Sequence, residues 1–259
     1  MQPGVEMRNV AAGRGWRWVV EGFALFRKSP VTWLAVTVLL ALLWILSFIV
    51  PVLGPLLFNL LSPVFFAGLM IGCRALEQNG RLEISHLFAG FRQSAAPLVT
   101  VGGVYLVGTI VVFGFIFLSA DGAKLAALAA KPGADLGAVR AALRNMGPAF
   151  AIGALAYVPL LMLVWYAPLL VALDGLAPLA AMKLSLQACL KNTAAFAVYG
   201  LAGLALSVAI SLPAALGAAG AGLAIALLIA SIPVLFCSIY VSYRDIFGTS
   251  DPAGARLSR

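Results

Sequence analysis

Four long stretches of the sequence contain no Asp, Glu, Lys or Arg. They cover residues 29–73, 93–120, 145–173 and 192–243. A soluble domain carries roughly 25% charged residues, spread over its exposed surface. This chain of 259 residues has 10% charged and 63% apolar residues. The pattern excludes a soluble globule and predicts an integral membrane protein.

The lengths of these stretches predict six membrane-spanning helices. A bilayer core of about 30 Å takes about 20 helical residues, so the first and last stretches hold two helices each and the others one each. Pro51, Gly54 and Pro55 break the first stretch, and Pro213 with Gly217 breaks the last. The expected spans are 31–50, 55–73, 97–118, 148–173, 195–215 and 221–242. We expect an all-α polytopic helical bundle that forms one integral membrane domain, 1–259.

The distribution of Lys and Arg predicts the orientation. Six spans place both termini on one side, and a cytoplasmic N-terminus puts 13 of the 17 cations in the cytoplasm. The four others are Lys124, Lys131, Arg140 and Arg144, in the polar segment 119–147. The positive-inside rule therefore predicts a multi-pass membrane protein with cytoplasmic termini. The net charge of +8 favours anionic lipid headgroups as partners and not nucleic acid.

A short segment with apolar residues at helical spacing precedes each pair of spans. These residues are Trp16, Val19, Val20, Phe23 and Phe26 in the first, Ile84, Leu87, Phe88 and Phe91 in the second, and Leu179, Met182, Leu186 and Leu190 in the third. The spacing predicts amphipathic helices at the cytoplasmic surface. Each is followed by two apolar spans that we expect to form a helical hairpin.

We interpret this pattern as three diverged units, each a surface helix plus a hairpin. The units are about 14–73, 84–173 and 176–243, with an extracytoplasmic helical insertion at 119–147 and a flexible tail at 244–259. The alternative is that any six-span protein has cations before its spans and prolines within them.

The repeated pattern indicates two sets of candidate functional residues. Arg27, Lys28, Arg92 and Lys191 end the surface segments, where they are expected to contact lipid headgroups or a partner. Pro63, Pro168 and Pro233 lie within spans and are candidate kink or gate residues, although prolines are also simply common in membrane helices. Arg74 follows Pro63 by eleven residues, and Arg244 follows Pro233 by the same distance.

The expected spans contain no ionisable acid or base, which argues against a transporter with an intramembrane charge relay. No hydrolase, metalloprotease or P-loop motif is present. Asp174, Glu77 and Glu83 are too few and too dispersed to predict an acid–base pair. The single His86 and the three cysteines, Cys73, Cys189 and Cys237, lack the spacing of a metal site or a disulfide framework. We therefore expect no catalytic residue, metal or cofactor, and no enzymatic activity.

Three regions together resemble a known group of sequences. They are GWRWVVEGFALFRKSP at 15–30, LFAGFR at 87–92, and the region from APLLV at 167–171 through AMKLS at 181–185 to CLKN at 189–192. They resemble an uncharacterised family of six-span proteobacterial inner-membrane proteins and, more remotely, the membrane domain fused to some glycerophosphodiester phosphodiesterases. The resemblance implies the fold and the location. It implies no activity, because no phosphodiesterase catalytic domain is present here.

Two functions fit these observations. The first is a non-enzymatic membrane scaffold whose cytoplasmic collar of helices binds lipid, a protein partner or a second copy of the chain. The alternative is a small permease or lipid-handling transporter gated at the three prolines. A solvent-connected cavity lined by Asn59, Tyr157 and Ser231 would favour transport, and a closed apolar interior would favour the scaffold.

Overall fold

A computed structural model describes residues 6–118, 120–129 and 135–248, and this part of the chain is helical with short connections. In chain order the helices are α1 (Arg14–Phe26), α2 (Pro30–Ser47), α3 (Leu53–Glu77), η1 (Ile84–Phe88), α4 (Ala89–Gln93), α5 (Ala95–Leu118), α6 (Ala120–Ala129), α7 (Leu136–Asn145), α8 (Gly147–Trp165), α9 (Ala167–Asp174), α10 (Pro178–Lys191), α11 (Thr193–Ser211), η2 (Leu212–Leu216) and α12 (Ala218–Phe247). Six segments are long and apolar enough to cross a membrane: α2, α3, α5, α8 with α9, α11 with η2, and α12. The predicted all-α bundle with six spans is confirmed.

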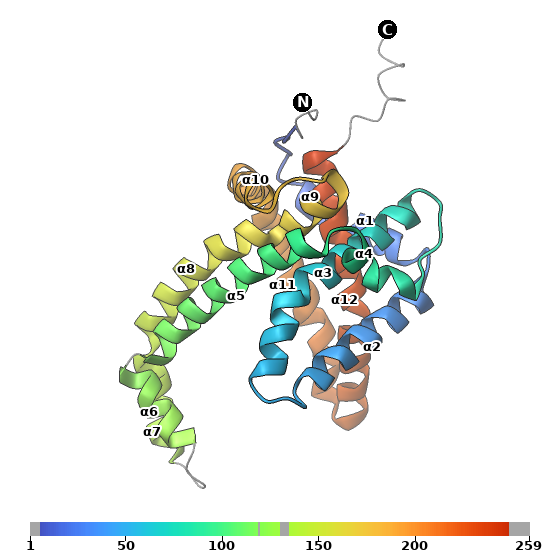
Figure 1. Cartoon of the computed structure of the whole chain (residues 1–259). Helices are drawn as coiled ribbons and strands as arrows, with labels where there is room; N and C mark the ends of the chain where they lie inside the picture. The colour runs from blue at the N-terminus through green and yellow to red at the C-terminus, as the bar shows by residue number, and fades with distance from the viewer. Residues whose placement is uncertain (1–5, 119, 130–134, 249–259) are drawn as a thin grey trace.

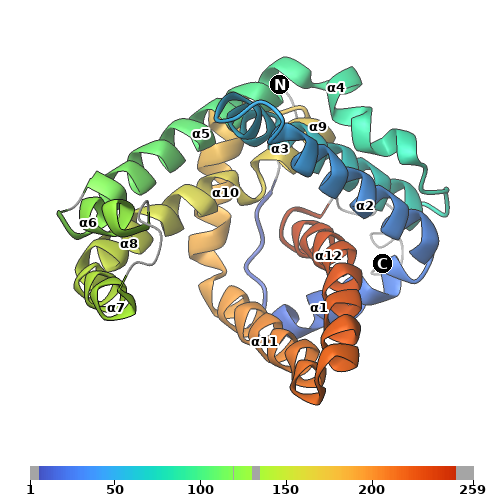
Figure 2. The same ribbon diagram turned by 90° about the horizontal axis from the view of Figure 1, so that it is seen from below.

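The spans lie as three pairs of helices in contact. α2 packs on α3, α5 on α8, and α11 on α12. Seen from below, the pairs occupy three sides of the molecule (Figure 2). They converge at the end that carries α1, α4, α9 and α10 (Figure 1), and α3 contacts both α9 and α12. We call this the charged end, because Glu21, Glu77, Asp174, Arg244 and Asp245 lie there.

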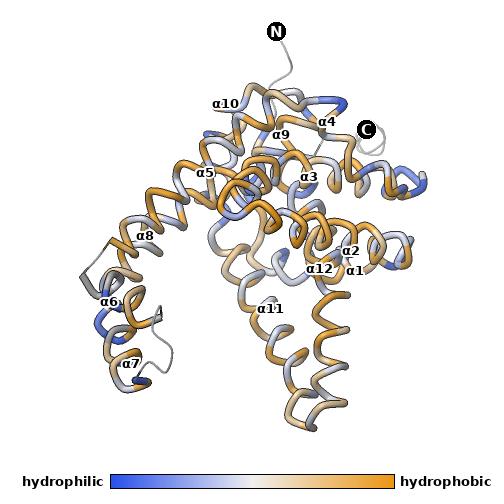
Figure 3. The backbone as a smooth tube through the Cα atoms, turned by 60° about the horizontal axis from the view of Figure 1, so that its bottom comes forward, coloured by the Kyte–Doolittle hydropathy of each residue, from blue (hydrophilic) through white to orange (hydrophobic). Residues whose placement is uncertain are grey.

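The buried core is concentrated where the three pairs converge. Leu69 and Met70 of α3, Leu170 of α9 and Ile246 of α12 are almost fully buried in one cluster. Away from the charged end, large apolar side chains are exposed, as at Leu155, which is 77% exposed. Figure 3 shows apolar helices between hydrophilic segments at the charged end and hydrophilic residues around α6 and α7. This distribution suits helices surrounded by lipid.

Helix α12 continues to Phe247, so residues 244–247 form its last turn and do not belong to a tail. The helix continues because Tyr243, Ile246 and Phe247 are buried at the charged end. The remaining tail, from residue 249, and Lys131 of the insertion lie outside the described residues. The rest of the insertion comprises α6 and α7, at the far end of the α5–α8 pair (Figure 1).

Helix α1 packs closely against the last pair of spans. It contacts α11 and α12, and a Cβ atom on Gly22 would lie 2.7 Å from the Cα of Ser238. Only glycine allows this approach. Trp18 is fully buried, whereas Trp16, Val20 and Phe23 of the predicted apolar stripe are about half exposed. Three residues of the predicted stripe thus point away from the bundle, whereas Phe26 is buried and Val19 packs against the core. The three-unit repeat stays a prediction.

The three prolines occupy two kinds of position. Pro63 and Pro233 lie inside the continuous helices α3 and α12. Proline cannot donate to the carbonyl four residues earlier. At Pro63 that carbonyl belongs to Asn59, and it accepts a hydrogen bond from the Ser62 hydroxyl at 2.8 Å. Pro168 instead lies in the first turn of α9, just after the break between α8 and α9.

Candidate functional site

The three pairs of spans surround an apolar cavity of about 250 Å³. Side chains from α2, α3, α5, α8, α9 and α12 form its wall. The wall includes Phe58, Pro63 and Leu69 of α3, Val164 of α8, Pro168 of α9 and Phe236 of α12. We call this space the apolar cavity. All three pairs of spans contribute side chains to it, the third pair through α12.

The polar residues that the sequence indicates for a transport path do not line the apolar cavity. Asn59, Tyr157 and Ser231 are absent from its wall. The Tyr157 hydroxyl bonds to that of Tyr105 at 2.8 Å, and the Ser231 hydroxyl donates to the Leu228 carbonyl at 2.7 Å. These two hydroxyls are therefore bonded to neighbouring protein groups, whereas the side-chain oxygen of Asn59 is buried without a hydrogen-bond partner among the described residues. The cavity has the character of a site for an apolar group.

A second pocket, of about 440 Å³, lies at the charged end and is formed by α3, α9, α12 and the residues directly after α3 and α12. Its wall comprises Arg74, Glu77, Gln78, Leu173, Asp174, Tyr240, Tyr243, Arg244 and Gly248, and we call it the charged pocket. Two tyrosines hold its carboxylates, because Tyr240 donates to Glu77 at 2.6 Å and Tyr243 donates to Asp174 at 2.5 Å. The pocket therefore presents fixed groups of both charges.

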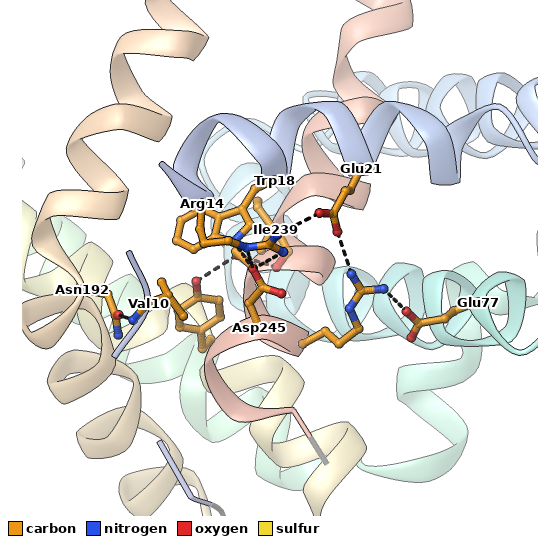
Figure 4. Close-up of polar contacts among 11 residues, drawn as sticks. Val10, Arg14, Trp18, Glu21, Glu77, Asn192, Ile239 and Asp245 are labelled. Atoms are coloured by element: carbon orange, nitrogen blue, oxygen red, sulfur yellow. Dashed lines mark hydrogen bonds and ion pairs between the residues drawn. The ribbon is translucent and has the colours of Figure 1, made fainter. Parts of the chain in front are cut away.

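Arg244 links the charged pocket to α1. Its guanidinium pairs with Glu77 of α3 and, at 2.7 Å, with Glu21 of α1. Figure 4 shows Glu21 and Glu77 turned toward the same guanidinium. Since the Arg244 side chain is 42% exposed, each of these pairs contributes modestly to stability. Together they join α1, α3 and α12 at the charged end.

Asp245 ties α12 to α1 through a more buried set of contacts. Its carboxylate pairs with Arg14 at 2.5 Å and accepts the indole N–H of Trp18 at 2.7 Å (Figure 4). Arg14 also pairs with Glu21 at 3.1 Å. Burial of the Arg14 guanidinium disfavours its charge, but Asp245 and Glu21 outweigh this and raise the Arg14 pKa. Arg14 therefore stays charged and fixed.

Asn192 ties the segment before α1 to the junction of α10 and α11. Its buried amide accepts a hydrogen bond from the Val10 N–H at 2.8 Å and donates to the carbonyl of Arg8 at 3.2 Å. The Arg8 N–H in turn donates to the carbonyl of Ile246 at 2.8 Å. The N-terminal segment is thus bonded to both α11 and α12.

A probable inner membrane protein of Burkholderia thailandensis is 34% identical to this chain, and the similarity covers 98% of each protein. The chain belongs to this family of inner membrane proteins. With its six apolar helices, it is a multi-pass inner membrane protein. No family profile and no solved structure matches the chain. The more remote link to the phosphodiesterase-fused domain stays a prediction.

The four cations predicted to contact headgroups lie at three places in this inner membrane protein, with Arg27 and Lys28 in the turn after α1, Arg92 in α4 and Lys191 in α10. Arg27 is exposed, with its guanidinium carbon 6.0 Å from the centre of the Phe23 ring. Lys28 donates to the carbonyl of Leu76 at 3.0 Å, near the end of α3, where a cation is favourable. Arg92 and Lys191 are exposed near the ends of α4 and α10. Contact of these side chains with lipid stays a prediction.

The proline candidates have different relations to the apolar cavity. Pro63 and Pro168 form part of its wall. Pro233 is buried in α12, three residues before the wall residue Phe236. A role for any of them as a gate stays a prediction.

The sequence interpretation of the acidic residues as dispersed was wrong for Glu77 and Asp174. Both line the charged pocket, because α3 and α9 converge at the charged end, whereas Glu83 lies outside its wall. The equal spacing of Arg74 and Arg244 from Pro63 and Pro233 was the one signal that pointed to this pocket. Within the described residues, no group of three or more His, Cys, Asp or Glu could hold a metal ion.

Proposed function

We propose that this inner membrane protein is a non-enzymatic, lipid-binding membrane protein. An acyl chain occupies the apolar cavity, and the lipid headgroup lies at the charged end, which faces the cytoplasm. The observation that carries the proposal is the wall of the cavity, to which all three pairs of spans contribute apolar side chains.

The chemistry of the wall favours a lipid over a water-soluble solute. Water is stable in a cavity only where it finds two to four polar partners. Here aromatic and aliphatic side chains such as Phe58, Phe236 and Leu69 dominate the wall. The hydroxyl of Tyr105 is already bonded to Tyr157. An acyl chain needs none of these hydrogen bonds.

Exposed cations at the charged end supply the second part of the proposal. Arg27, Arg92 and Lys191 lie near the ends of the short helices that precede the spans. Lysine and arginine near a cytoplasmic membrane surface attract anionic lipid, each by about 1 kcal/mol. These side chains would hold the surrounding lipid layer while the cavity holds a single bound molecule.

A matched pair of valine substitutions on α8 tests the proposal. Val164 lines the cavity, whereas Val158 is 49% exposed and lies outside the wall. Val164→Trp should fill the cavity and remove the lipid that co-purifies with the protein in detergent, measured by native mass spectrometry. Val158→Trp should retain it. Equal lipid retention by the two variants would reject the proposal.

Lipid movement is the second candidate function. Pro63 and Pro168 stand in the cavity wall. Pro63 lacks the backbone donor that would stiffen α3, and Pro168 lies in the first turn of α9, at the break after α8. Such sites suit a gate that lets a lipid enter or cross. Fluorescent-lipid scrambling in proteoliposomes should slow in Pro63→Ala and Pro168→Ala. It should be unchanged in Pro159→Ala, whose proline is exposed on α8 and lies outside the wall. Absence of scrambling by the native protein would reject lipid movement, and lipid binding would remain as the proposed function.

A further inference from the structure

The charged pocket holds a cation, Arg74, and a carboxylate, Asp174, that form no salt bridge with each other. Burial raises the Asp174 pKa, and the nearby charge of Arg74 only partly opposes this rise. Among the described residues, the hydrogen-bond partner of the Arg74 guanidinium is the Leu173 carbonyl, at 3.4 Å. A guanidinium has five N–H donors, so most of those on Arg74 are available. Asp174 accepts the Tyr243 hydroxyl on one carboxylate oxygen, which leaves its second oxygen available.

The other charged groups of the pocket are occupied. Glu77 accepts the Tyr240 hydroxyl and pairs with Arg244, and Arg244 also pairs with Glu21. Because Tyr240 and Tyr243 use their protons on the two carboxylates, their oxygen atoms keep lone pairs that can accept further hydrogen bonds. The pocket therefore offers free donors at Arg74 and free acceptors at Asp174 and the two tyrosines.

This arrangement selects a ligand that carries both charges. A guanidinium binds phosphate through two parallel hydrogen bonds. A primary ammonium has three N–H donors, and Asp174, Tyr240 and Tyr243 offer three acceptors. A purely anionic group would be repelled by the two carboxylates. A quaternary ammonium has no N–H donor, so it would leave the three acceptors without hydrogen bonds.

The position of the pocket fits a lipid headgroup. Helices α3, α9 and α12 contribute to the walls of both the charged pocket and the apolar cavity. On α3, Leu69 of the cavity precedes Arg74 of the pocket by five residues, a rise of about 7.5 Å along a helix. The headgroup would therefore lie just beyond the acyl chain, on the side of the charged end.

We propose that the charged pocket binds the phosphate and primary ammonium of a zwitterionic phospholipid of the phosphatidylethanolamine type. Arg74 binds the phosphate, and Asp174 with Tyr240 and Tyr243 binds the ammonium. This inference rests on the proposed lipid-binding function and names the lipid class. The same headgroup chemistry also exists in soluble phosphoethanolamine.

Native mass spectrometry of the full chain in detergent tests the proposal. The probes are phosphatidylethanolamine, phosphatidylglycerol and phosphatidylcholine with identical acyl chains, and soluble phosphoethanolamine. The native protein should bind phosphatidylethanolamine about tenfold more tightly than the other two lipids, which corresponds to about 1.4 kcal/mol. Asp174→Asn should abolish this preference, and Arg74→Gln should weaken the binding of all three lipids. Lys183→Gln, which removes an exposed cation on α10 that lies outside the wall of the pocket, should change neither property.

The outcomes separate this inference from the proposed function. Lipid binding without a headgroup preference, or a preference that survives Asp174→Asn, overturns the inference and leaves the proposed function standing. Binding of soluble phosphoethanolamine alone, lost in Asp174→Asn, supports the chemistry of the pocket and rejects lipid binding. Arg74→Lys keeps the charge without the planar guanidinium and should restore part of the binding lost in Arg74→Gln. Unchanged lipid binding in Arg74→Gln, with unchanged thermal unfolding, counts against the assignment of the phosphate to Arg74.

Discussion

The hydroxyl of Ser185, on α10, stands in the backbone break before α9, where it accepts the Tyr166 N–H at 2.9 Å. The same hydroxyl donates to the carbonyl of Met162 at 2.6 Å, so it replaces the direct helical bond between these two backbone groups. A side chain inserted in this way breaks the span between α8 and α9. The break lies directly before Pro168, which forms part of the cavity wall.

Ser185→Ala should lower the stability of the protein. The substitution leaves the buried Tyr166 N–H without its partner, which costs about 1–3 kcal/mol. The measurement is thermal unfolding in detergent, compared with Ser207→Ala. The Ser207 hydroxyl bonds only to the Gly203 carbonyl of its own helix and is exposed, so its removal should have little effect. Equal unfolding temperatures for both variants would contradict the role of Ser185.

Asp245→Asn should destabilise the contact between α1 and α12. The Asp245 side chain is 14% exposed, and the substitution removes the charge that partners Arg14. We expect a loss of about 1–3 kcal/mol in the free energy of unfolding. The comparison is Trp18→Phe, which removes the indole hydrogen bond to Asp245 but keeps an aromatic ring in the buried site and keeps the Arg14–Asp245 pair. The free energy of unfolding of each variant is measured at low and high salt. If Trp18→Phe changed its salt dependence more than Asp245→Asn does, the Arg14–Asp245 ion pair would not be the contact that Asp245→Asn removes.

The pair between Arg244 and Glu77 should show weak, salt-dependent coupling. Their side chains are 42% and 31% exposed, so a double-mutant cycle with Arg244→Gln and Glu77→Gln should give about 1 kcal/mol or less. The coupling should fall further in 1 M salt, where the screening length is about 3 Å. Denaturation of the four proteins at low and high salt provides the measurement. A coupling that is large and independent of salt would show that water does not reach the pair.

The orientation can be tested by cysteine labelling in whole cells. The native cysteines Cys73, Cys189 and Cys237 are buried, so new surface thiols should dominate the labelling. Asp135→Cys places a thiol just before α7, and Gln187→Cys places one on an exposed position of α10. With cytoplasmic termini, a membrane-impermeant maleimide should label position 135 in intact cells and position 187 only after permeabilisation. The reverse pattern would invert the topology.

The spans were predictable because a hydrocarbon core excludes charge, and the charge-free stretches therefore mark the helices that cross it. Hydropathy could not predict where these helices end. α3 continues past Arg74 to Glu77, and α12 continues past Arg244 to Phe247. The charged pocket is built on these extra turns. Its members come from segments far apart in the sequence, and only their packing brings them together.

The apolar cavity was not predictable for a different reason. Polar residues within spans, such as Tyr157 and Ser231, are the usual indicators of a transport path, and the predicted path was based on them. In the structure both hydroxyls are bonded to nearby protein groups, the Tyr105 hydroxyl and the Leu228 carbonyl. The cavity is defined by the meeting of ordinary apolar side chains, which single residues in a sequence cannot indicate.

The most direct test of lipid binding is photolabelling in the native membrane with a phospholipid that carries a diazirine near the end of its acyl chain. Mass spectrometry of the digested protein locates the adducts. We expect adducts on cavity residues, in particular Phe58, Val164 and Phe236, in addition to outward-facing positions such as Leu155 and Leu201. In Val164→Trp the cavity adducts should disappear while the outer ones remain. Adducts confined to outward-facing residues in the native protein would contradict the presence of lipid between the three pairs of spans.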